Sequence, residues 1–221
     1  MVADQPLFPL CLITDRLALG PGGDLLKVVE QALRGGVPAV QLREKDLTSR
    51  ELFDLASEIR NLTRRHHARL LINDRVDVAL AVGADGVHLG HQSLPVAKVR
   101  SLLGHKKLIG VSTHRLEEIL PAARQGANFL TFSPVYFTPS KAGYGPAQGL
   151  ERLQSACRTS PIPVLALGGI RPEKLAELRA AGASGIALIS AILNAEDPRK
   201  AASNMMETLA AEGFCAAAAS L

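Results

Sequence analysis

Residues 69–90 read RLLINDRVDVALAVGADGVHLG, and this stretch decides the fold class. An apolar run over 69–73 predicts a buried strand, a helical pattern follows over 74–83, and a second apolar run over 85–89 predicts another strand. A strand, a helix and a second strand in this order are typical of parallel pairing through a right-handed crossover. The first strand ends in an amide and a carboxylate, Asn73 and Asp74.

The same unit recurs along the whole chain of 221 residues. Helical patterns alternate with eight predicted strands, at 10–14, 38–43, 69–73, 85–89, 107–112, 128–132, 162–167 and 185–189. Eight such units predict a single-domain α/β protein with a closed (β/α)8 TIM barrel. An open doubly wound sheet is the alternative. We expect residues 1–8 and 212–221 to lie at the periphery of the domain.

Local signals support this organisation. The helix predicted over 48–67 opens with Thr48 and carries Glu51 three residues later, which is the spacing of a capping box. The starts of three predicted strands, at 83–86, 126–128 and 181–183, share a Gly-Ala pattern and form a weak internal repeat.

The composition limits the classes of function. Hydrophobic residues make up 47% of the chain but aromatic residues only 4%, so the core must be aliphatic, as suits parallel strands covered on both faces. The formal charge of +4 is scattered, which argues against a nucleic-acid surface and fits an anionic small-molecule substrate. Three distant cysteines indicate neither a disulfide framework nor a zinc site. Without a membrane-length apolar run or a leader segment, we expect a cytoplasmic protein.

The carboxyl ends of barrel strands carry the chemistry. Gln41, Arg43 and Lys45 alternate at the end of the strand predicted over 38–43, and a period of two places them on one side, toward the lumen. Two inward cations require an anionic partner. In the alternative, the strand ends at Arg43 and Lys45 turns outward.

Asp74 follows a strand end directly and can ligate a hard divalent cation, most naturally Mg²⁺ bridging a phosphate. The alternative role of Asp74 is an N-cap for the helix that begins near Val76. Ser112 and His114 lie at the end of the fifth predicted strand. His114 is either an acid/base residue or a polar cap on the following helix.

Three further segments suit phosphate binding. The stretch over 133–146, SPVYFTPSKAGYGP, reads as an active-site loop in which Thr138, Ser140 and Lys141 offer hydroxyl groups and a cation, although a solvated loop is the alternative. Glycines at 168 and 169 follow the seventh strand, and Ser190 opens a short helix after the eighth. Free amide groups at these two loops form the usual phosphate cup of such barrels.

Taken together, these motifs resemble the thiamine phosphate synthase and thiazole tautomerase family. The resemblance runs through LITDR (12–16), QLREKD (41–46), LLINDRVDVALAVGADGVHLG (70–90), GVSTH (110–114), TPSK (138–141), ALGGI (166–170) and ISAI (189–192). It implies a barrel enzyme of thiamine biosynthesis that uses Mg²⁺ and joins a pyrimidine diphosphate to a thiazole phosphate with release of pyrophosphate.

The resemblance also implies roles for individual residues. The pyrimidine diphosphate would be held by Gln41, Arg43, Lys45, Asn73, Ser112 and Lys141, of which Arg43, Ser112 and Lys141 would be catalytic. The thiazole phosphate would be held by Thr138, Ser140, Gly169, Ile189 and Ser190. The metal would be held by Asp74 and Ser93.

One departure from the family pattern concerns the metal. The synthase pattern carries a second acidic ligand after HLG, whereas this chain reads HLGHQSLP and places Ser93 at that position. A hydroxyl group ligates Mg²⁺ with less charge than a carboxylate. The substitution leaves open a metal-free tautomerase with His114 as the acid/base, or a non-catalytic protein that binds thiazole or thiamine phosphate. A homo-oligomer is compatible with the sequence.

Overall fold

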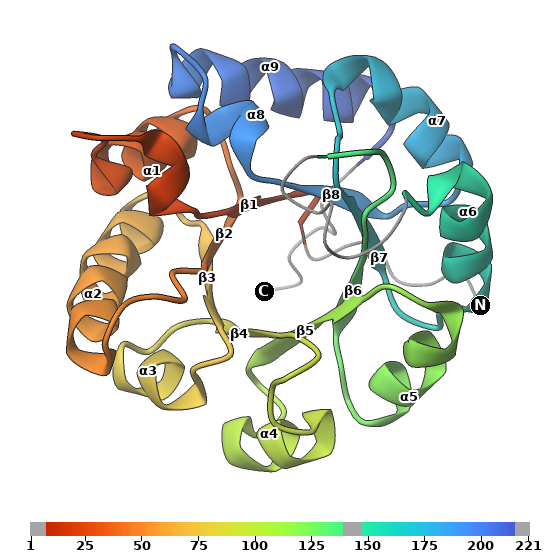
Figure 1. Cartoon of the computed structure of the whole chain (residues 1–221), viewed down its shortest axis with the longest axis horizontal. Helices are drawn as coiled ribbons and strands as arrows, with labels where there is room; N and C mark the ends of the chain where they lie inside the picture. Colours follow the sequence, from red (N-terminus) through yellow and green to blue (C-terminus); the bar gives the residue numbers. More distant parts are fainter. Residues whose placement is uncertain (1–7, 139–146, 215–221) are drawn as a thin grey trace.

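The computed structural model describes residues 8–138 and 147–214, and it is a closed barrel of eight parallel strands (Figure 1). The pairing of the first strand with the eighth, through Leu10–Ile186 and Leu12–Leu188, closes the ring and excludes the open sheet. The predicted TIM barrel is therefore confirmed. The strands are β1 (Leu10–Ile13), β2 (Ala39–Leu42), β3 (Arg69–Asn73), β4 (Gly86–Leu89), β5 (Leu108–Thr113), β6 (Phe129–Phe132), β7 (Val164–Leu167) and β8 (Gly185–Leu188).

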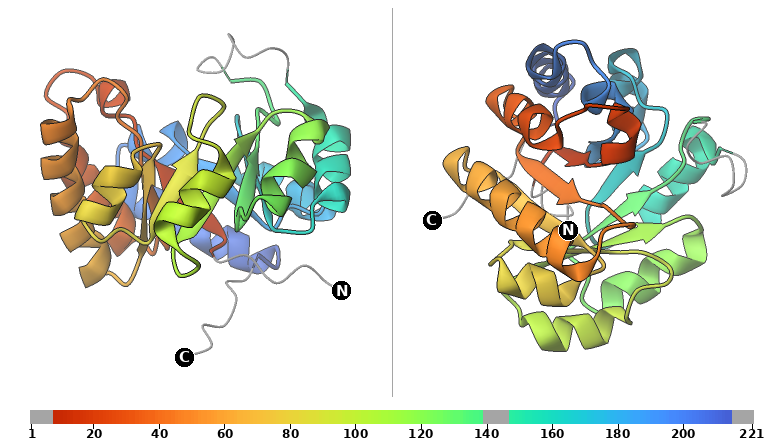
Figure 2. Two further views of the ribbon diagram at one scale, coloured as in Figure 1. Left: turned by 90° about the horizontal axis from the view of Figure 1, so that it is seen from below. Right: turned by 60° about the vertical axis from the view of Figure 1, so that its left-hand side comes forward.

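Helices form an outer layer around the strands, as the side views show (Figure 2). They are α1 (Leu25–Arg34), α2 (Ser49–Arg65), α3 (Val76–Ala81), α4 (Val96–Leu103), α5 (Ile119–Arg124), α6 (Gly149–Thr159), α7 (Leu175–Ala180), α8 (Ser190–Leu193) and α9 (Pro198–Ala211), with 3-10 turns η1 (Arg16–Leu19), η2 (Leu116–Glu118) and η4 (Pro172–Lys174). Helix α2 begins with the predicted capping box of Thr48 and Glu51. Within the described ranges, no helix combines the length and the apolar character that a membrane crossing needs.

Two apolar layers hold the barrel together. One lies between the strands and the helices, and the other fills the lumen. At the amino end of the lumen, the rings of Phe8 and Phe129 meet edge to face with their centroids 5.3 Å apart. Phe214, beyond α9, is also buried and lies under the guanidinium group of Arg179. Phe8 and Phe214 thus belong to the core, although we expected both terminal segments to be peripheral.

At two of the three strand starts that share the Gly-Ala pattern, those of β4 and β6, a polar side chain binds the preceding strand. Asp85 precedes β4, and its carboxylate accepts a hydrogen bond of 2.8 Å from the amide of Leu70 on β3. Asn128 precedes β6, and its side-chain oxygen accepts an equal bond from the amide of Ile109 on β5. In both places a polar side chain extends the ladder by one bond beyond the paired strand.

Removing the carboxylate of Asp85 should lower the stability of the protein. The carboxylate of Asp85 also forms ion pairs with Arg60 at 2.6 Å and Arg69 at 3.3 Å, and Asp85 and Arg60 are largely buried. Asp85→Ala leaves a buried guanidinium group and a strand amide unpaired, so we expect the free energy of unfolding to fall by about 3 kcal/mol in urea titrations. The matched control is Asp77→Ala, whose exposed carboxylate pairs only with nearby Arg75 in the described structure; it should cost less than about 0.5 kcal/mol. Equal losses in both variants would contradict this account.

Candidate active site at the carboxyl ends of the strands

The end of β2 places an amide in the barrel mouth. Gln41 pairs in register with Leu71, which lies in the luminal core, so its side chain points inward as predicted. Its Nε2 donates to Oδ1 of Asn73 at 3.0 Å, while its buried Oε1 has no hydrogen-bond partner among the described residues. An unpaired buried oxygen of this kind costs about 1–3 kcal/mol. A ligand that donates a hydrogen bond at this position would remove that cost.

The inward row that we predicted beyond Gln41 is wrong at Lys45. Strand β2 ends at Leu42, after which Arg43 is half-buried, Glu44 is buried and Lys45 is exposed. The alternation of inward and outward side chains stops here because the carboxylate of Glu44 accepts hydrogen bonds from two residues that follow β1. The donors are the hydroxyl group of Thr14 and the amide of Arg16. Lys45 therefore lies on the surface beyond the end of β2 and not in the lumen.

The two predicted metal ligands lie in contact with each other. Ser93 donates its hydroxyl proton to Oδ1 of Asp74, and the amide of Gly90 donates to the same oxygen at 3.3 Å. Asn73 donates from Nδ2 to Oδ2 of Asp74 at 2.7 Å. The alternative role of Asp74 as a helix cap is wrong, because Arg75 is the N-cap of α3 and no side chain caps this helix. The carboxylate is exposed at the rim, where solvent or a metal can reach it.

A positive φ explains this orientation of Asp74. Its backbone is left-handed, with φ +59°, a conformation that aspartate tolerates better than most residues. Its amide nevertheless donates to the carbonyl of His88 at 3.0 Å, which keeps the residue tied to β4. The turn directs the carboxylate toward Gly90 and Ser93 in the loop after β4 and away from α3.

Ser112 and His114 lie on and just beyond β5. Ser112 pairs in register with Thr131 of β6. One imidazole nitrogen of His114, Nδ1, lies 2.7 Å from the carbonyl oxygen of Ser133 and must carry the proton, because a carbonyl only accepts. The amide of His114 donates to Glu118 at 2.7 Å, so the carboxylate of Glu118 binds the start of this turn.

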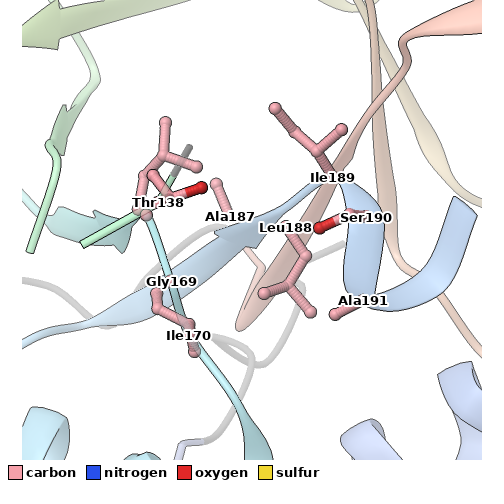
Figure 3. Close-up of a pocket in the computed structure, with 10 residues that line it drawn as sticks. Thr138, Gly169, Ile170, Ala187, Leu188, Ile189, Ser190 and Ala191 are labelled. Carbon is pink, nitrogen blue, oxygen red and sulfur yellow. The ribbon is translucent and has the colours of Figure 1, made fainter. Parts of the chain in front are cut away.

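A cavity of about 70 Å³ lies where we predicted the phosphate cup. Its lining includes Thr138, Gly169, Ile189 and Ser190, all four of the described residues assigned to it, together with Gly168 and an apolar wall of Ala187 and Leu188. The hydroxyl oxygens of Thr138 and Ser190 face the space between them (Figure 3). The first amides of the short helix α8 have no partner within the helix. Ser140 and Lys141 lie outside the described residues.

Backbone packing forms one wall of the cavity. Gly169 has φ +64°, and a Cβ atom there would lie 2.7 Å from the carbonyl oxygen of Phe137. Gly168 has φ +104°, and its carbonyl oxygen accepts a 3.1 Å bond from the amide of Tyr136. The phenol of Tyr136 donates to Glu177 on α7 at 2.7 Å. The segment before Thr138 is thereby held against the glycine turn.

The site also contains polar residues to which the sequence analysis gave no role. Thr14 and Glu44 are buried at the ends of β1 and β2, and burial raises the pKa of Glu44 above its usual range although the bonds from Thr14 and Arg16 oppose this shift. The position of Glu44 between two predicted cations was the signal in the sequence. Thr14 offered none, because threonine is common in strands.

The glycine packing predicts the effect of a single methyl group. Gly169→Ala adds a clash with Phe137 to the strain of a left-handed alanine, and should cost about 2–4 kcal/mol in the free energy of unfolding. Gly104→Ala is the matched control, since Gly104 has φ +66° and no atom within 4 Å of the added Cβ. It should lose only about 1–2 kcal/mol. Indistinguishable urea midpoints for the two variants would rule out close packing at Gly169.

Comparisons with known proteins identify the family of this chain. The family model described as thiamine monophosphate synthase matches residues 10–192. A relative from Geobacter sulfurreducens is 56% identical over 202 residues, which cover 91% of this chain and 94% of the relative. The thiamine-phosphate synthase of Desulfitobacterium hafniense strain Y51 is 44% identical, with 90% of this chain and 96% of that protein covered. The thiamine-phosphate synthase of Synechocystis sp. is 46% identical over 87% of this chain but longer, and only 56% of its length is covered.

Solved structures show the same relationship. The thiamine phosphate pyrophosphorylase of Pyrococcus furiosus superposes with a TM-score of 0.83 at 38% identity, covering 94% of this chain and 97% of that one. A thiamine phosphate pyrophosphorylase from Bacteroides thetaiotaomicron, at 18% identity and a TM-score of 0.68 over 92% of this chain and 98% of that one, supports the fold alone. By sequence and by structure, the chain belongs to the thiamine monophosphate synthase family.

Proposed function

We propose that this protein is a thiamine phosphate synthase. It would condense 4-amino-2-methyl-5-(diphosphooxymethyl)pyrimidine with a thiazole phosphate, giving thiamine phosphate and pyrophosphate, or with carboxythiazole phosphate, giving the same products and CO₂. The observation that carries this proposal is the presence of two polar regions on one rim of the barrel. One is built from Gln41, Asn73 and Asp74, and the other is the cavity lined by Thr138, Gly169 and Ser190.

The reaction breaks the bond between the pyrimidine methylene carbon and the diphosphate oxygen. Positive charge develops on that carbon and negative charge on the departing pyrophosphate, and the thiazole nitrogen then forms the new bond to the carbon. Fixed cations aimed at the leaving group stabilise this separation of charge. Arg43 and Lys45, with Lys141 from the loop after β6, would supply them. Binding both substrates at one rim adds the advantage of orientation.

A carbocation-like carbon also requires that competing nucleophiles are kept away. In the described ranges the free thiols are Cys11 and Cys157, and burial raises the pKa of each to about 12. Both therefore remain protonated and weakly nucleophilic at neutral pH. Neither of these two described thiols would therefore compete with the thiazole nitrogen for the carbon.

The pyrimidine ring fits the end of β2. Its exocyclic amine is a hydrogen-bond donor, and the buried Oε1 of Gln41 is an acceptor that lacks a partner in the described structure. Asn73 fixes the Gln41 amide by accepting from its nitrogen, which leaves the oxygen directed at the ligand. Ser112, on β5, would contribute a hydroxyl group to the same substrate from another part of the rim.

The thiazole phosphate fits the cavity between β7 and β8. Its phosphate would accept hydrogen bonds from the hydroxyl groups of Thr138 and Ser190 and from the backbone around Gly169 and Ile189, with Ser140 completing the set. The apolar wall of Ala187 and Leu188 suits the adjoining carbon atoms.

Mg²⁺ is the metal that these residues fit. Asp74 offers an exposed carboxylate and Ser93 an adjoining hydroxyl group. No cluster of three or more His, Cys, Asp and Glu side chains occurs in the described ranges. Mg²⁺ suits such a sparse site because it commonly uses one or two carboxylates and completes its shell with water and substrate phosphates. When bound, it would offset charge on the diphosphate.

A direct assay tests the function. Purified protein with both substrates and Mg²⁺ should release pyrophosphate, because the site holds the leaving group among fixed cations. His114→Ala should retain this activity, since no step of the condensation requires the imidazole as an acid or base. Pyrophosphate is measured with a coupled phosphatase, and a reaction without the thiazole phosphate is the control.

The same mixture distinguishes the two other candidates. Conversion of carboxythiazole phosphate to its aromatic isomer, lost in His114→Ala and without pyrophosphate release, would identify a tautomerase. Calorimetric binding of thiazole phosphate with neither reaction would identify a non-catalytic binding protein. Either result would overturn the proposed synthase.

The metal site makes a separate prediction. Asp74→Asn should raise the Mg²⁺ concentration for half-maximal activity by roughly tenfold, because a carboxylate ligand is lost. Ser93→Asp should lower it, since it adds a second carboxylate beside the first. Asp77→Asn, an exposed carboxylate on α3 that pairs with Arg75, is the control and should leave the requirement unchanged. If the Asp74 and Ser93 variants both required the same Mg²⁺ concentration as the unaltered protein, this metal site would be excluded.

A further inference from the structure

A buried carboxylate lies at the edge of the proposed diphosphate site. Glu44 is only 6% exposed and stands between Arg43 and Lys45, two of the residues assigned to the diphosphate. A carboxylate here would repel an anionic substrate, and burying it carries a desolvation cost. Such a residue must therefore contribute something that a neutral side chain would not.

The contacts of Glu44 join the ends of two strands. The hydroxyl group of Thr14, which is completely buried, donates to Oε1 of Glu44 at 2.5 Å and accepts from the amide of Arg43 at 2.9 Å. The amide of Arg16 donates to Oε2 of Glu44 at 3.0 Å. Thr14 also donates its own amide proton to the carbonyl of Gln41 at 2.9 Å. We refer to Thr14 and Glu44 as the β1–β2 clamp.

The clamp continues the pairing of β1 and β2 past the point where both strands end. Strand β1 ends at Ile13 and β2 at Leu42, yet the backbone of Arg43 and the side chain of Glu44 remain bound to Thr14. The position of the Arg43 backbone, and with it the direction in which its side chain leaves the chain, is thereby fixed.

Arg16 offsets the charge that the clamp introduces. Its Nε lies 4.0 Å from Oε2 of Glu44, and its guanidinium group also pairs with Asp46. Both carboxylates that flank Lys45 are thus bound by the same cation. Arg16 offsets part of their negative charge, which weakens the repulsion that a diphosphate bound by Arg43 and Lys45 would meet.

We propose that Thr14 and Glu44 are positioning residues for diphosphate binding, acting through Arg43 without touching the substrate. This inference rests on the proposed function, because it assigns the diphosphate to Arg43. It predicts that the hydroxyl group of Thr14 controls affinity for the pyrimidine diphosphate and for pyrophosphate itself, with a much smaller effect on the binding of the thiazole phosphate, none of whose assigned residues the clamp holds by a hydrogen bond in the described structure.

A pair of conservative variants tests the clamp. Thr14→Val keeps the shape of the side chain but removes the hydroxyl group, and Thr14→Ser keeps the hydroxyl group. Thr14→Val should lower kcat/KM for the pyrimidine diphosphate and weaken calorimetric binding of inorganic pyrophosphate, each by roughly tenfold or more, because a charged hydrogen bond is lost. Thr14→Ser should stay within about threefold of the unaltered protein, and KM for the thiazole phosphate should change little in either variant.

A double-mutant cycle separates positioning from general structural damage. In an Arg43→Ala background, Thr14→Val should cause little further loss of pyrophosphate affinity, because the side chain that it positions is gone. An undiminished loss in that background, or equal behaviour of Thr14→Val and Thr14→Ser, would overturn the proposal. Should Thr14→Val fail to fold, Thr14→Ala, which removes the same hydroxyl group and leaves the charge of Glu44 in place, is used in the same cycle and judged by the same criteria.

The readouts keep the two proposals distinguishable. Absence of pyrophosphate release by the unaltered protein would refute the synthase assignment, while the binding of inorganic pyrophosphate would still decide for or against the clamp. Pyrophosphate release combined with a Thr14→Val variant that binds pyrophosphate normally would refute the clamp alone.

Discussion

The pairing of β1 with β8 is the constraint on which the rest of this structure depends. Through Leu10, Cys11 and Leu12 it turns a parallel sheet into a closed ring, so every strand points its carboxyl end at the same rim. Residues far apart in the chain, such as Gln41 and Asn73 or Asp74 and Ser93, meet there because their strands are neighbours in the ring. Without closure, the two proposed substrate regions would lie on opposite edges of an open sheet.

Polar side chains at the amino end of the barrel stabilise the fold, and those at the carboxyl end form the proposed site. At the amino end, Asp85 and Asn128 each extend a strand ladder and each bind an arginine. At the carboxyl end, the structure retains an unpaired amide oxygen on Gln41 and a left-handed aspartate at 74. Unpaired polar atoms and strained backbone conformations are common at ligand-binding sites, because a bound ligand can offset their cost in free energy.

Sequence patterns predicted the regular elements well and the strand ends less well. The capping box of α2 and the eight strands follow from local hydrogen bonding and apolar runs, so they were visible in the chain itself. The inward position of Lys45 was predicted by extending a period of two, and it failed because Glu44 is bound by Thr14 from another strand. The helix-cap alternative for Asp74 failed for a similar reason, since its carboxylate turns to the loop after β4.

The sequence by itself determined the barrel, its aliphatic core and the family, because these depend on periodicity, composition and ordered motifs that are properties of the chain. Only the tertiary structure decided which polar groups are paired and which remain available to a ligand. The Gln41 oxygen, the contact of Ser93 with Asp74 and the burial of Glu44 all depend on side chains from neighbouring strands. Hydrogen bonds across 30 or more residues leave no periodic signal in one sequence, since each is set by the register of two strands and not by local spacing.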